Sequence, residues 1–592
     1  MCKEAVLMKK VLLVAINAKY IHSNLAVHSL RASAGESKDA VFIAEYTINQ
    51  QKDEILRDIF LNGPEVLCFS CYLWNLEYVE AVSKEFHKLC PDVPIWLGGP
   101  EVSYETKTFL EEHAYLTGVM IGEGEDTFRE LCEYYLKAEW RNADKPRTEA
   151  DASLLTIKGI AFRELDKIHF TAPREPKSLS DVPFCYEDLK EYENRIIYYE
   201  SSRGCPFSCS YCLSSIDKKL RFRDLGLVRK ELEFFLEKKV PQVKFVDRTF
   251  NCDREHAREI LRYVTEHDNG ITNFHFEISA DLLEEEDLRL MEKMRPGLIQ
   301  LEIGVQTTNE ATIHEIHRSM KLERVKAAVS RIRSLGNIHQ HLDLIAGLPY
   351  EGLQSFRHSF DEILSLWPNQ LQLGFLKVLK GSYMYEHADE YEIAYHDAPP
   401  YEVLRTKWLS YEEILQIKKV EEMLEAYYNS GQFEVTMKLL NAMTDSMFAL
   451  LMELGWFYEQ KGYFGMSHSR LHRCEILLEF LKERKEGNEP SDLAAFEEAL
   501  TFDLYYRENC KTRPSWAPDQ SQYKEMTKRL CKKGKLNHLE PVHYHFPEKS
   551  ERGLNKLPER LPEPLWALFD YEERDPLDHQ AKVIFYNFNE MT

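Results

Sequence analysis

The N-terminal part of the chain alternates short apolar runs with longer amphipathic stretches. The runs show no polar alternation and lie at residues 11–16, 41–46, 66–72, 95–99 and 118–124. Such runs are typical of parallel strands covered on both faces, and the stretches between them, such as 77–89, are typical of helices. Residues 1–140 are therefore predicted to form a doubly wound, Rossmann-like α/β domain, in which ligands bind beyond the carboxyl ends of the strands.

A second series of strands and helices follows further along the chain. Its apolar runs lie at 196–201, 242–247, 275–279, 298–306, 341–349 and 370–379. Six parallel strands with crossover helices predict a partial β/α barrel over residues 195–399, with an active site at the C-terminal strand ends. Between the two series, a polar stretch, a predicted hairpin at 157–170 and a proline-bearing stretch indicate a linker over 141–194. From 400 to 592 the helical period dominates and predicts a mostly helical C-terminal domain, with one helix ending near Gly431.

Composition and charge narrow the class of protein. The 592 residues are 44% hydrophobic and 29% charged, which is typical of a globular chain. No apolar run approaches the roughly 18 to 20 residues that cross a bilayer, and the first run is too short for a signal peptide, so we expect a cytoplasmic protein. The 75 basic and 98 acidic residues give a net charge of -23, which disfavours a nucleic-acid partner.

Three of the 13 cysteines form a tight group. Cys205, Cys209 and Cys212 are spaced by three and then two residues, directly after a predicted strand. Soft thiolates at this spacing select zinc, copper or an iron-sulfur cluster. A structural zinc site needs four ligands, and no fourth Cys or His lies nearby in the sequence, so the pattern favours a 4Fe-4S cluster over zinc. Such a cluster has one iron without a protein ligand, where a small molecule can bind.

The segment Cys205-Pro-Phe-Ser-Cys209-Ser-Tyr211-Cys212 resembles the signature of the radical SAM family, including an aromatic residue before the third cysteine. The resemblance implies that the three cysteines hold a catalytic 4Fe-4S cluster. Its open iron would bind S-adenosylmethionine, and an electron from the cluster would cleave this cofactor to methionine and a 5'-deoxyadenosyl radical. Tyr211 is expected to flank the adenine.

The same resemblance extends to polar residues at later strand ends. Asp247 lies in FVDRTF, at the place of a motif that is glycine-rich in many members and contacts the cofactor's amino group; FVDRTF is similar to the cobalamin-linked subgroup. The other matches follow the branch that includes oxygen-independent coproporphyrinogen oxidase. They imply that Glu277 binds the amino group of S-adenosylmethionine, that Gln306 and Asp343 bind its ribose, and that Arg318 binds its carboxylate. They also imply that the backbone at Gly347 passes close to the adenine.

The N-terminal domain resembles the cobalamin-binding domain of the largest radical SAM methylase class, on the segments SCYLWN, LGGPEVS and IGEGEDTF. The resemblance implies cobalamin contacts from strand-end loops, namely Tyr20, His22, Ser70, Trp74, Gly98, Gly99, Gly122 and Glu123. The D-x-H-x-x-G motif of other corrinoid domains is absent, because Tyr20 precedes His22 by two residues and Leu25 follows it by three. His22 is therefore expected beneath the cobalt without ligating it. The segment after 400 resembles the C-terminal extension of an uncharacterised subgroup.

These features favour a cobalamin-dependent radical SAM methyltransferase. It would act through methylcobalamin and a 5'-deoxyadenosyl radical on an unactivated carbon, or phosphorus, of a small-molecule or peptide substrate. It would take electrons from a flavodoxin- or ferredoxin-like donor. One alternative is a rearrangement or redox enzyme with the same cofactors and no methyl transfer, and another is a non-catalytic corrinoid or iron-sulfur carrier or sensor. A tRNA methylthiotransferase is disfavoured, because Cys68, Cys71 and Cys90 lack a cluster arrangement and the chain is acidic.

Overall fold

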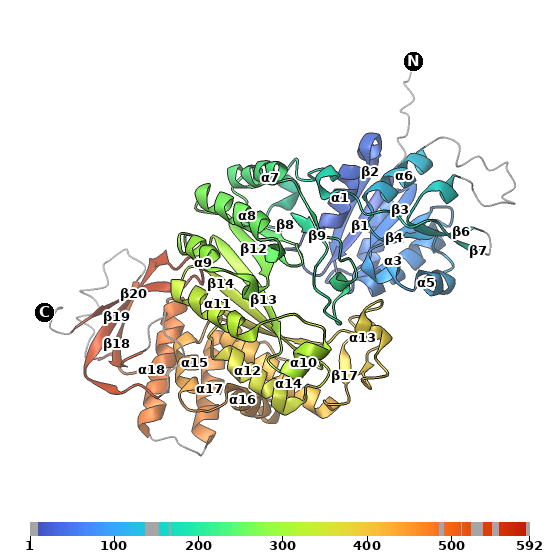
Figure 1. The fold of residues 1–592 in the computed structure, drawn as a ribbon. Helices are drawn as coiled ribbons and strands as arrows, with labels where there is room; N and C mark the ends of the chain where they lie inside the picture. Colours follow the sequence, from blue (N-terminus) through green and yellow to red (C-terminus); the bar gives the residue numbers. More distant parts are fainter. Residues whose placement is uncertain are drawn as a thin grey trace. The chain divides into compact units, whose positions relative to one another are not determined.

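The computed structural model describes residues 10–136, 153–164, 167–484, 490–510, 512–521, 537–546 and 556–587. Figure 1 shows its helices and strands, coloured along the sequence. The chain forms two units. The first comprises Met1–Glu277 and Lys377–Val403, and the second comprises Ile278–Leu376 and Leu404–Thr592. Each unit is described by itself below.

A seven-stranded sheet opens the first unit. Its parallel strands are β1 (Val11–Asn17), β2 (Val41–Thr47), β3 (Val66–Ser70), β4 (Ile95–Gly98) and β5 (Gly118–Met120), in the order β2-β1-β3-β4-β5. The helices between them are α1 (Leu25–Ser33), α2 (Lys52–Asn62), α3 (Leu76–Leu89), α4 (Pro100–Ser103) and α5 (Thr106–Glu112), and α6 (Glu125–Leu136) follows β5. This is the predicted doubly wound arrangement.

Alternate residues of the central strand β1 enter two separate cores. Leu12, Val14 and Ile16 pack with residues of α2 and α3 on one face. Val11, Leu13 and Ala15 pack with residues of α1 and α6 on the other face. Because both faces are buried, the strand carries no polar alternation, as its sequence predicted.

The hairpin predicted at 157–170 consists of β6 (Ile160–Glu164) and β7 (Lys167–Phe170). Instead of standing apart in a linker, it extends the first sheet, since β6 pairs antiparallel with β5. The segment that follows is held by Arg223, whose guanidinium donates to the Leu179 and Val182 carbonyls and pairs with Glu231. The domain boundaries given above remain predictions.

The second series of parallel strands begins in the first unit and continues in the second. In the first unit β8 (Ile197–Tyr199), β11 (Gln242–Phe245) and β12 (Asn273–Ile278) pair in parallel, with α7 (Leu225–Glu237) and α8 (Arg254–Glu266) between them. In the second unit β13 (Ile299–Gln306), β14 (His339–Ala346) and β15 (Gln370–Phe375) pair in parallel. The helices of this part are α9 (Glu285–Glu292), α10 (Glu310–Glu315), α11 (Leu322–Leu335) and α12 (Leu353–Leu364). These are the six strands that a partial barrel requires.

The C-terminal region is helical first and then forms a small sheet. Its elements are α13 (Tyr383–Glu386), β16 (Ala394–Tyr395), β17 (Val403–Arg405), α14 (Tyr411–Met423), α15 (Glu434–Asn441), α16 (Met447–Lys461), α17 (Arg470–Glu483), α18 (Pro490–Arg507), β18 (Asn537–Tyr544), β19 (Arg560–Arg574) and β20 (Ala581–Tyr586). Helix α14 continues as a π-helical segment over Leu424–Asn429, and Gly431, just beyond it, has a φ of 60° and donates its amide to Tyr428 O. The helix end predicted near Gly431 is therefore confirmed. The antiparallel sheet β18-β19-β20 was not predicted. Among the helices described, none has the length and apolar character that a membrane crossing requires.

Candidate functional site

A short hairpin closes the cysteine loop, defined here as residues 204–220. Strand β9 (Ser202–Arg203) pairs antiparallel with β10 (Arg221–Phe222), so the loop leaves and returns at one place. Gly204 has a φ of 90°, and a Cβ atom there would lie 2.6 Å from Lys219 O. The Cys205 amide donates to Asp217 O at 3.0 Å. Glycine is therefore required at the entrance of this loop.

The three thiols of the loop are free of disulfides. Cys205 and Cys209 are buried and Cys212 is half-buried, and the Cys212 amide donates to Cys209 O at 3.1 Å. Cys205 Sγ lies 3.7 Å from Thr249 Oγ1. Three soft donors held in one closed loop fit the donor set of a 4Fe-4S cluster. Tyr211 lies in the same loop and is half-buried.

Asp247, two residues after β11, is hydrogen-bonded to the residues that precede the cysteine loop. Its carboxylate is 1% exposed and accepts from Ser201 N at 3.0 Å, Ser201 Oγ at 2.7 Å and Ser202 Oγ at 2.5 Å. Burial raises the pKa of Asp247, and these three donors act against that rise. The side chain thus fixes the turn that leads into the cysteine loop, and its contact with a cofactor amino group remains a prediction. Glu277, at the end of β12, is half-buried, with Lys244 Nζ 3.9 Å away.

In the second unit the remaining predicted residues gather at the carboxyl ends of β13 and β14. Asp343 lies opposite Gly304 in the parallel ladder, and the Arg318 guanidinium donates to Gly304 O. Gln306 has a φ of 75°, and the missing Cβ of Gly304 leaves room for its side chain. Gly347 follows β14 with a φ of 90°. The four predicted residues therefore share one edge of this sheet.

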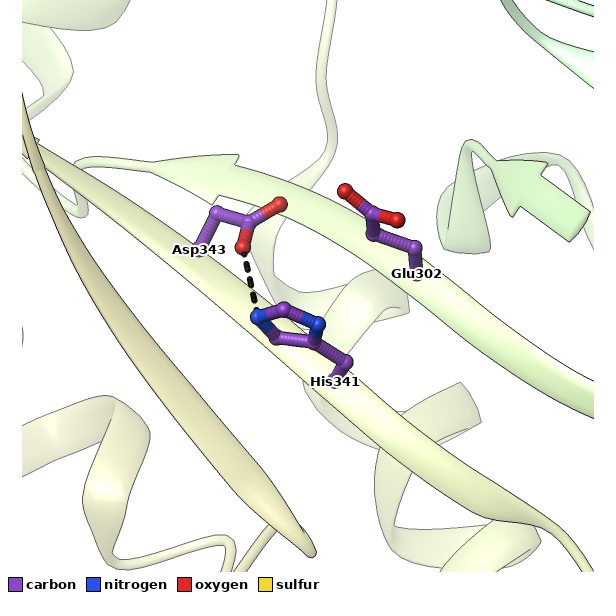
Figure 2. Close-up of side chains that lie close together, drawn as sticks. All are labelled: Glu302, His341 and Asp343. Atoms are coloured by element: carbon purple, nitrogen blue, oxygen red, sulfur yellow. Dashed lines mark ion pairs between the residues drawn. The ribbon is translucent and has the colours of Figure 1, made fainter. Parts of the chain in front are cut away.

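Two residues beneath Asp343 escaped the sequence analysis. Figure 2 shows Glu302 of β13 and His341 of β14 beside it, with their ligand-type atoms all within 4.8 Å of one another. His341 Nε2 lies 3.2 Å from Asp343 Oδ1, and Glu302 is directly opposite His341. Along β13 the apolar positions are buried and Glu302 falls on the alternate, polar face. That period-two alternation was the signal that could have revealed Glu302. It places polar side chains, which can hydrogen-bond to a polar ligand, on one face of the sheet.

In the N-terminal domain, His22 contacts a strand of the second series. Its Nδ1 lies 2.6 Å from the Tyr198 hydroxyl of β8, and Ser23 Oγ donates to Ile196 O at 2.8 Å. Burial, with the charges of Lys19 and Lys244, lowers the pKa of His22 and so favours the neutral ring. One ring nitrogen is thus already engaged by Tyr198, which the sequence analysis missed.

The loop after β3 is fastened to the end of β1. Asn75 Nδ2 donates to Ile16 O at 3.0 Å and to Ser70 O at 2.9 Å, and Trp74 Nε1 donates to Ile16 O at 3.1 Å. Trp74 is 45% exposed, and its ring stacks on Tyr72 with centroids 4.7 Å apart. This pair presents an aromatic surface beside the strand ends. The predicted contact Tyr20 is also exposed, with the Arg195 guanidinium 5.0 Å from its ring centroid.

The loop after β4 packs against the loop after β3. The Cys71 amide donates to Gly98 O at 2.7 Å, and Gly99 has a φ of 122°. A Cβ atom on Gly99 would overlap the carbonyl oxygen of Cys71, so only glycine permits this approach. Gly122, after β5, has a φ of 79° and open space around it. The predicted corrinoid residues therefore lie on neighbouring loops at one edge of the sheet.

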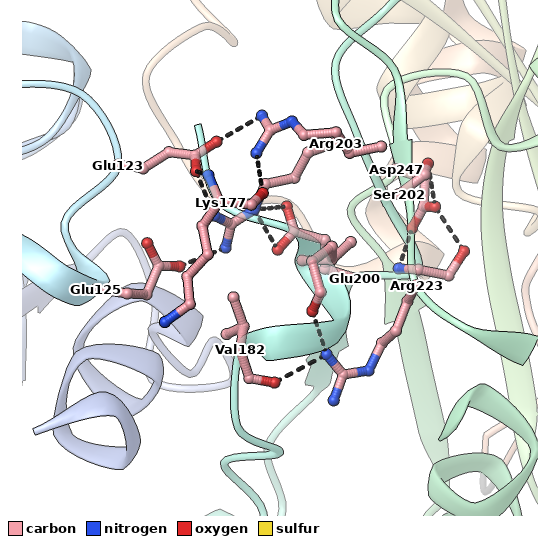
Figure 3. Close-up of polar contacts among 12 residues, drawn as sticks. Glu123, Glu125, Lys177, Val182, Glu200, Ser202, Arg203, Arg223 and Asp247 are labelled. Atoms are coloured by element: carbon pink, nitrogen blue, oxygen red, sulfur yellow. Dashed lines mark hydrogen bonds and ion pairs between the residues drawn. The ribbon is translucent and has the colours of Figure 1, made fainter. Parts of the chain in front are cut away.

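Glu123, another predicted corrinoid contact, faces the hairpin that closes the cysteine loop (Figure 3). Its carboxylate pairs with Arg221 at 2.5 Å and with Arg203 at 3.4 Å. Arg203 also pairs with Glu125 at 2.5 Å and with Glu200 at 2.8 Å. Burial works against ionisation of Glu125, but Arg203 prevails and lowers its pKa. Burial raises the pKa of Glu200 to about 7.

Comparisons with protein families match the two series of strands to two different domains. Residues 11–132 match the B12 binding domain, and residues 199–363 match the radical SAM superfamily. Residues 389–556 match a family described as proteins of unknown function (DUF4080). The chain thus combines a B12-binding domain with a radical SAM domain, and the resemblance recognised in its sequence is confirmed.

Known proteins with the same combination are similar along much of the chain. The cobalamin-dependent radical SAM methyltransferase TokK of Streptomyces tokunonensis is 26% identical over 345 residues, which cover 56% of this chain and 48% of TokK. The chain spans about half the length of the curated relatives it matches. Among solved structures, the methyltransferase TsrM of Kitasatospora setae, with cobalamin and a [4Fe-4S] cluster, has a TM-score of 0.53 at 16% identity, covering 66% of this chain and 78% of TsrM. The cobalamin-dependent radical enzyme OxsB, with aqua-cobalamin, has a TM-score of 0.53 at 13% identity, covering 84% and 80%. These likenesses show the fold.

Proposed function

We propose that the chain is a cobalamin-dependent radical SAM methyltransferase that acts on an unactivated carbon or phosphorus of a small molecule. One observation carries the proposal: three thiols that form no disulfide occupy a closed loop whose hairpin is ion-paired, within one unit, to the strand-end loop of the B12-binding domain. When bound, the cluster and S-adenosylmethionine supply a radical, and the corrinoid supplies the methyl group.

The residues of the chain would bind and orient these groups. Cys205, Cys209 and Cys212 would hold the cluster. Arg318 offers a fork of donors to a carboxylate, and Asp343 offers acceptors to ribose hydroxyls. Glu277, Gln306 and Gly347 complete the proposed cofactor set, and the loops after β1, β3, β4 and β5 would hold cobalamin.

Two further functions share this architecture. In a rearrangement or redox enzyme, the same cofactors would act without methyl transfer; OxsB is described as a cobalamin-dependent S-adenosylmethionine radical enzyme. In a carrier or sensor, S-adenosylmethionine would not be cleaved. The proposed enzyme would receive electrons from a flavodoxin- or ferredoxin-like donor in the cytoplasm.

Anaerobic reconstitution tests the proposal. The full chain should take up about four irons and bind hydroxocobalamin, whereas the triple variant Cys205→Ala, Cys209→Ala, Cys212→Ala should lose the iron and keep its fold. With S-adenosylmethionine deuterated in its methyl group, transfer of the label to a small-molecule product supports methyl transfer. Unlabelled product formed together with 5'-deoxyadenosine would establish the rearrangement. A triple variant that keeps its full iron would refute the cluster assignment.

A further inference from the structure

We propose that Arg203 is a positioning residue that couples the corrinoid loop to the cysteine loop, so that filling one cofactor site strengthens binding at the other. The corrinoid loop is defined as residues 121–125, after β5. The inference rests on the proposed function, since it assigns a cobalamin site to one loop and a cluster to the other. Arg203 itself contacts neither cofactor in this proposal and acts through the loops it joins.

The guanidinium of Arg203 pairs with carboxylates of the corrinoid loop and with one carboxylate of the segment before the hairpin. Glu200, which precedes the hairpin and directly follows β8, lies 2.8 Å from Nε. Glu125 of the corrinoid loop lies 2.5 Å from Nη2, and Glu123 lies 3.4 Å from Nη1. A planar guanidinium can serve three acceptors in fixed directions, which the point charge of a lysine cannot reproduce. Replacing Arg203 would leave these carboxylates to repel one another and would weaken the connection between the two loops.

A second arginine repeats the connection on the opposite strand of the hairpin. Arg221 pairs with Arg203 in the β9–β10 ladder. Its Nη2 lies 2.5 Å from Glu123 and 2.9 Å from Asp217, a residue of the cysteine loop. The corrinoid loop is therefore bound to both strands that close the cysteine loop.

The ion pair between Arg203 and Glu125 is largely shielded from water. The side chain of Arg203 is 17% exposed and that of Glu125 is 8% exposed. The pKa of Arg203 is raised because its pairing with these carboxylates outweighs burial. Ion pairs in such surroundings are screened less by salt than pairs on the surface. The pair between Arg229 of α7 and Glu259 of α8 is a natural control, because its side chains are 51% and 31% exposed.

Coupling follows from the short covalent path to each site. Arg203 precedes Cys205 by two residues, and Glu123 directly follows Gly122 of the corrinoid loop. A ligand that orders either loop also orders Arg203 and its ion pairs, so the chain loses less conformational entropy when the second ligand binds. By thermodynamic linkage the effect must be equal in both directions.

The test is the affinity of the full chain for hydroxocobalamin, measured by absorbance titration with the cluster present and absent. We expect wild-type chain to bind roughly tenfold more tightly when the cluster is present, within the range of about 5-fold to 150-fold that is usual for coupled sites. In Arg203→Gln and Glu125→Gln this ratio should fall to about half of the wild-type value or less, and it should fall close to one when Arg221→Gln, which removes the second pair with Glu123, is added to Arg203→Gln. Combining Arg203→Gln with Glu125→Gln should show little further loss, whereas Arg229→Gln should keep the wild-type ratio and Arg203→Lys should be intermediate.

The outcomes separate the coupling from the proposed function. A wild-type ratio of one, or an unchanged ratio in a folded Arg203→Gln chain, would refute the coupling while cobalamin binding stands. If Arg203→Gln does not fold, Glu125→Gln tests the same bridge from the other loop, and an unchanged ratio there would refute it equally. Failure of the cluster-loaded wild-type chain to bind hydroxocobalamin would refute the proposed function together with the coupling.

Discussion

Replacing Gly204 by alanine should prevent the cysteine loop from holding a cluster. The residue has a φ of 90°, and holding an L-residue in that region costs about 1 to 3 kcal/mol. The new Cβ would also lie 2.6 Å from Lys219 O, which belongs to the backbone returning to β10. Relief of that overlap requires opening the β9–β10 ladder, so the three thiols would no longer be held in one closed loop.

Iron and sulfide content after anaerobic reconstitution measures this effect. We expect Gly204→Ala to bind less than half the wild-type iron, while its far-ultraviolet circular dichroism stays unchanged. Gly63→Ala is the matched control: its φ is 58° and no atom lies within 4 Å of the added Cβ, so it carries strain without overlap. That variant should lose about 1 to 2 kcal/mol of stability and keep its iron. Full iron content in Gly204→Ala would refute the argument.

Three other sets of substitutions test separate parts of the molecule. Arg318→Ala and Asp343→Ala should each weaken S-adenosylmethionine binding by about 1.5 to 3 kcal/mol, measured by calorimetry with the cluster intact; unchanged affinity in both would remove them from the cofactor site. Burial raises the pKa of Glu351 from 4.5 to about 7, so the folded chain favours the protonated carboxyl. As pH rises from 4.5 to 7, the wild-type chain should therefore lose about 3 kcal/mol of unfolding free energy relative to Glu351→Gln, which does not titrate. A difference in urea stability between the two chains that stays constant over this pH range would contradict this. His22→Ala should leave the paramagnetic resonance spectrum of bound Co(II) cobalamin unchanged and without nitrogen splitting, and a splitting lost in this variant would make His22 the axial ligand.

The parallel strands and the cysteine loop could be predicted because their signals are local. Apolar runs such as Val11–Asn17 report burial on both faces of a strand, and the cysteine spacing lies within eight residues. The partners Tyr198 and Arg203 could not be predicted, because each meets residues more than 75 positions away. Nothing in the local pattern specifies such contacts.

The C-terminal sheet was missed for a different reason. Strand β18 contains Pro541, and β19 contains Pro562 and Pro564. Proline lacks a ladder donor and normally argues against a strand. Here the antiparallel ladder continues past Pro541, which lies opposite Trp566. Tertiary pairing and the buried Trp566 ring outweigh the local preference.

The central claim is that one chain brings a cluster, S-adenosylmethionine and cobalamin together for radical chemistry. Its most direct test is the formation of 5'-deoxyadenosine by the reconstituted full chain with hydroxocobalamin, S-adenosylmethionine and a strong reductant under anaerobic conditions. The account predicts 5'-deoxyadenosine and methionine in equal amounts, lost when Cys205, Cys209 and Cys212 are replaced by alanine. A chain that carries both cofactors and forms no 5'-deoxyadenosine, or forms as much without the three cysteines, would contradict it.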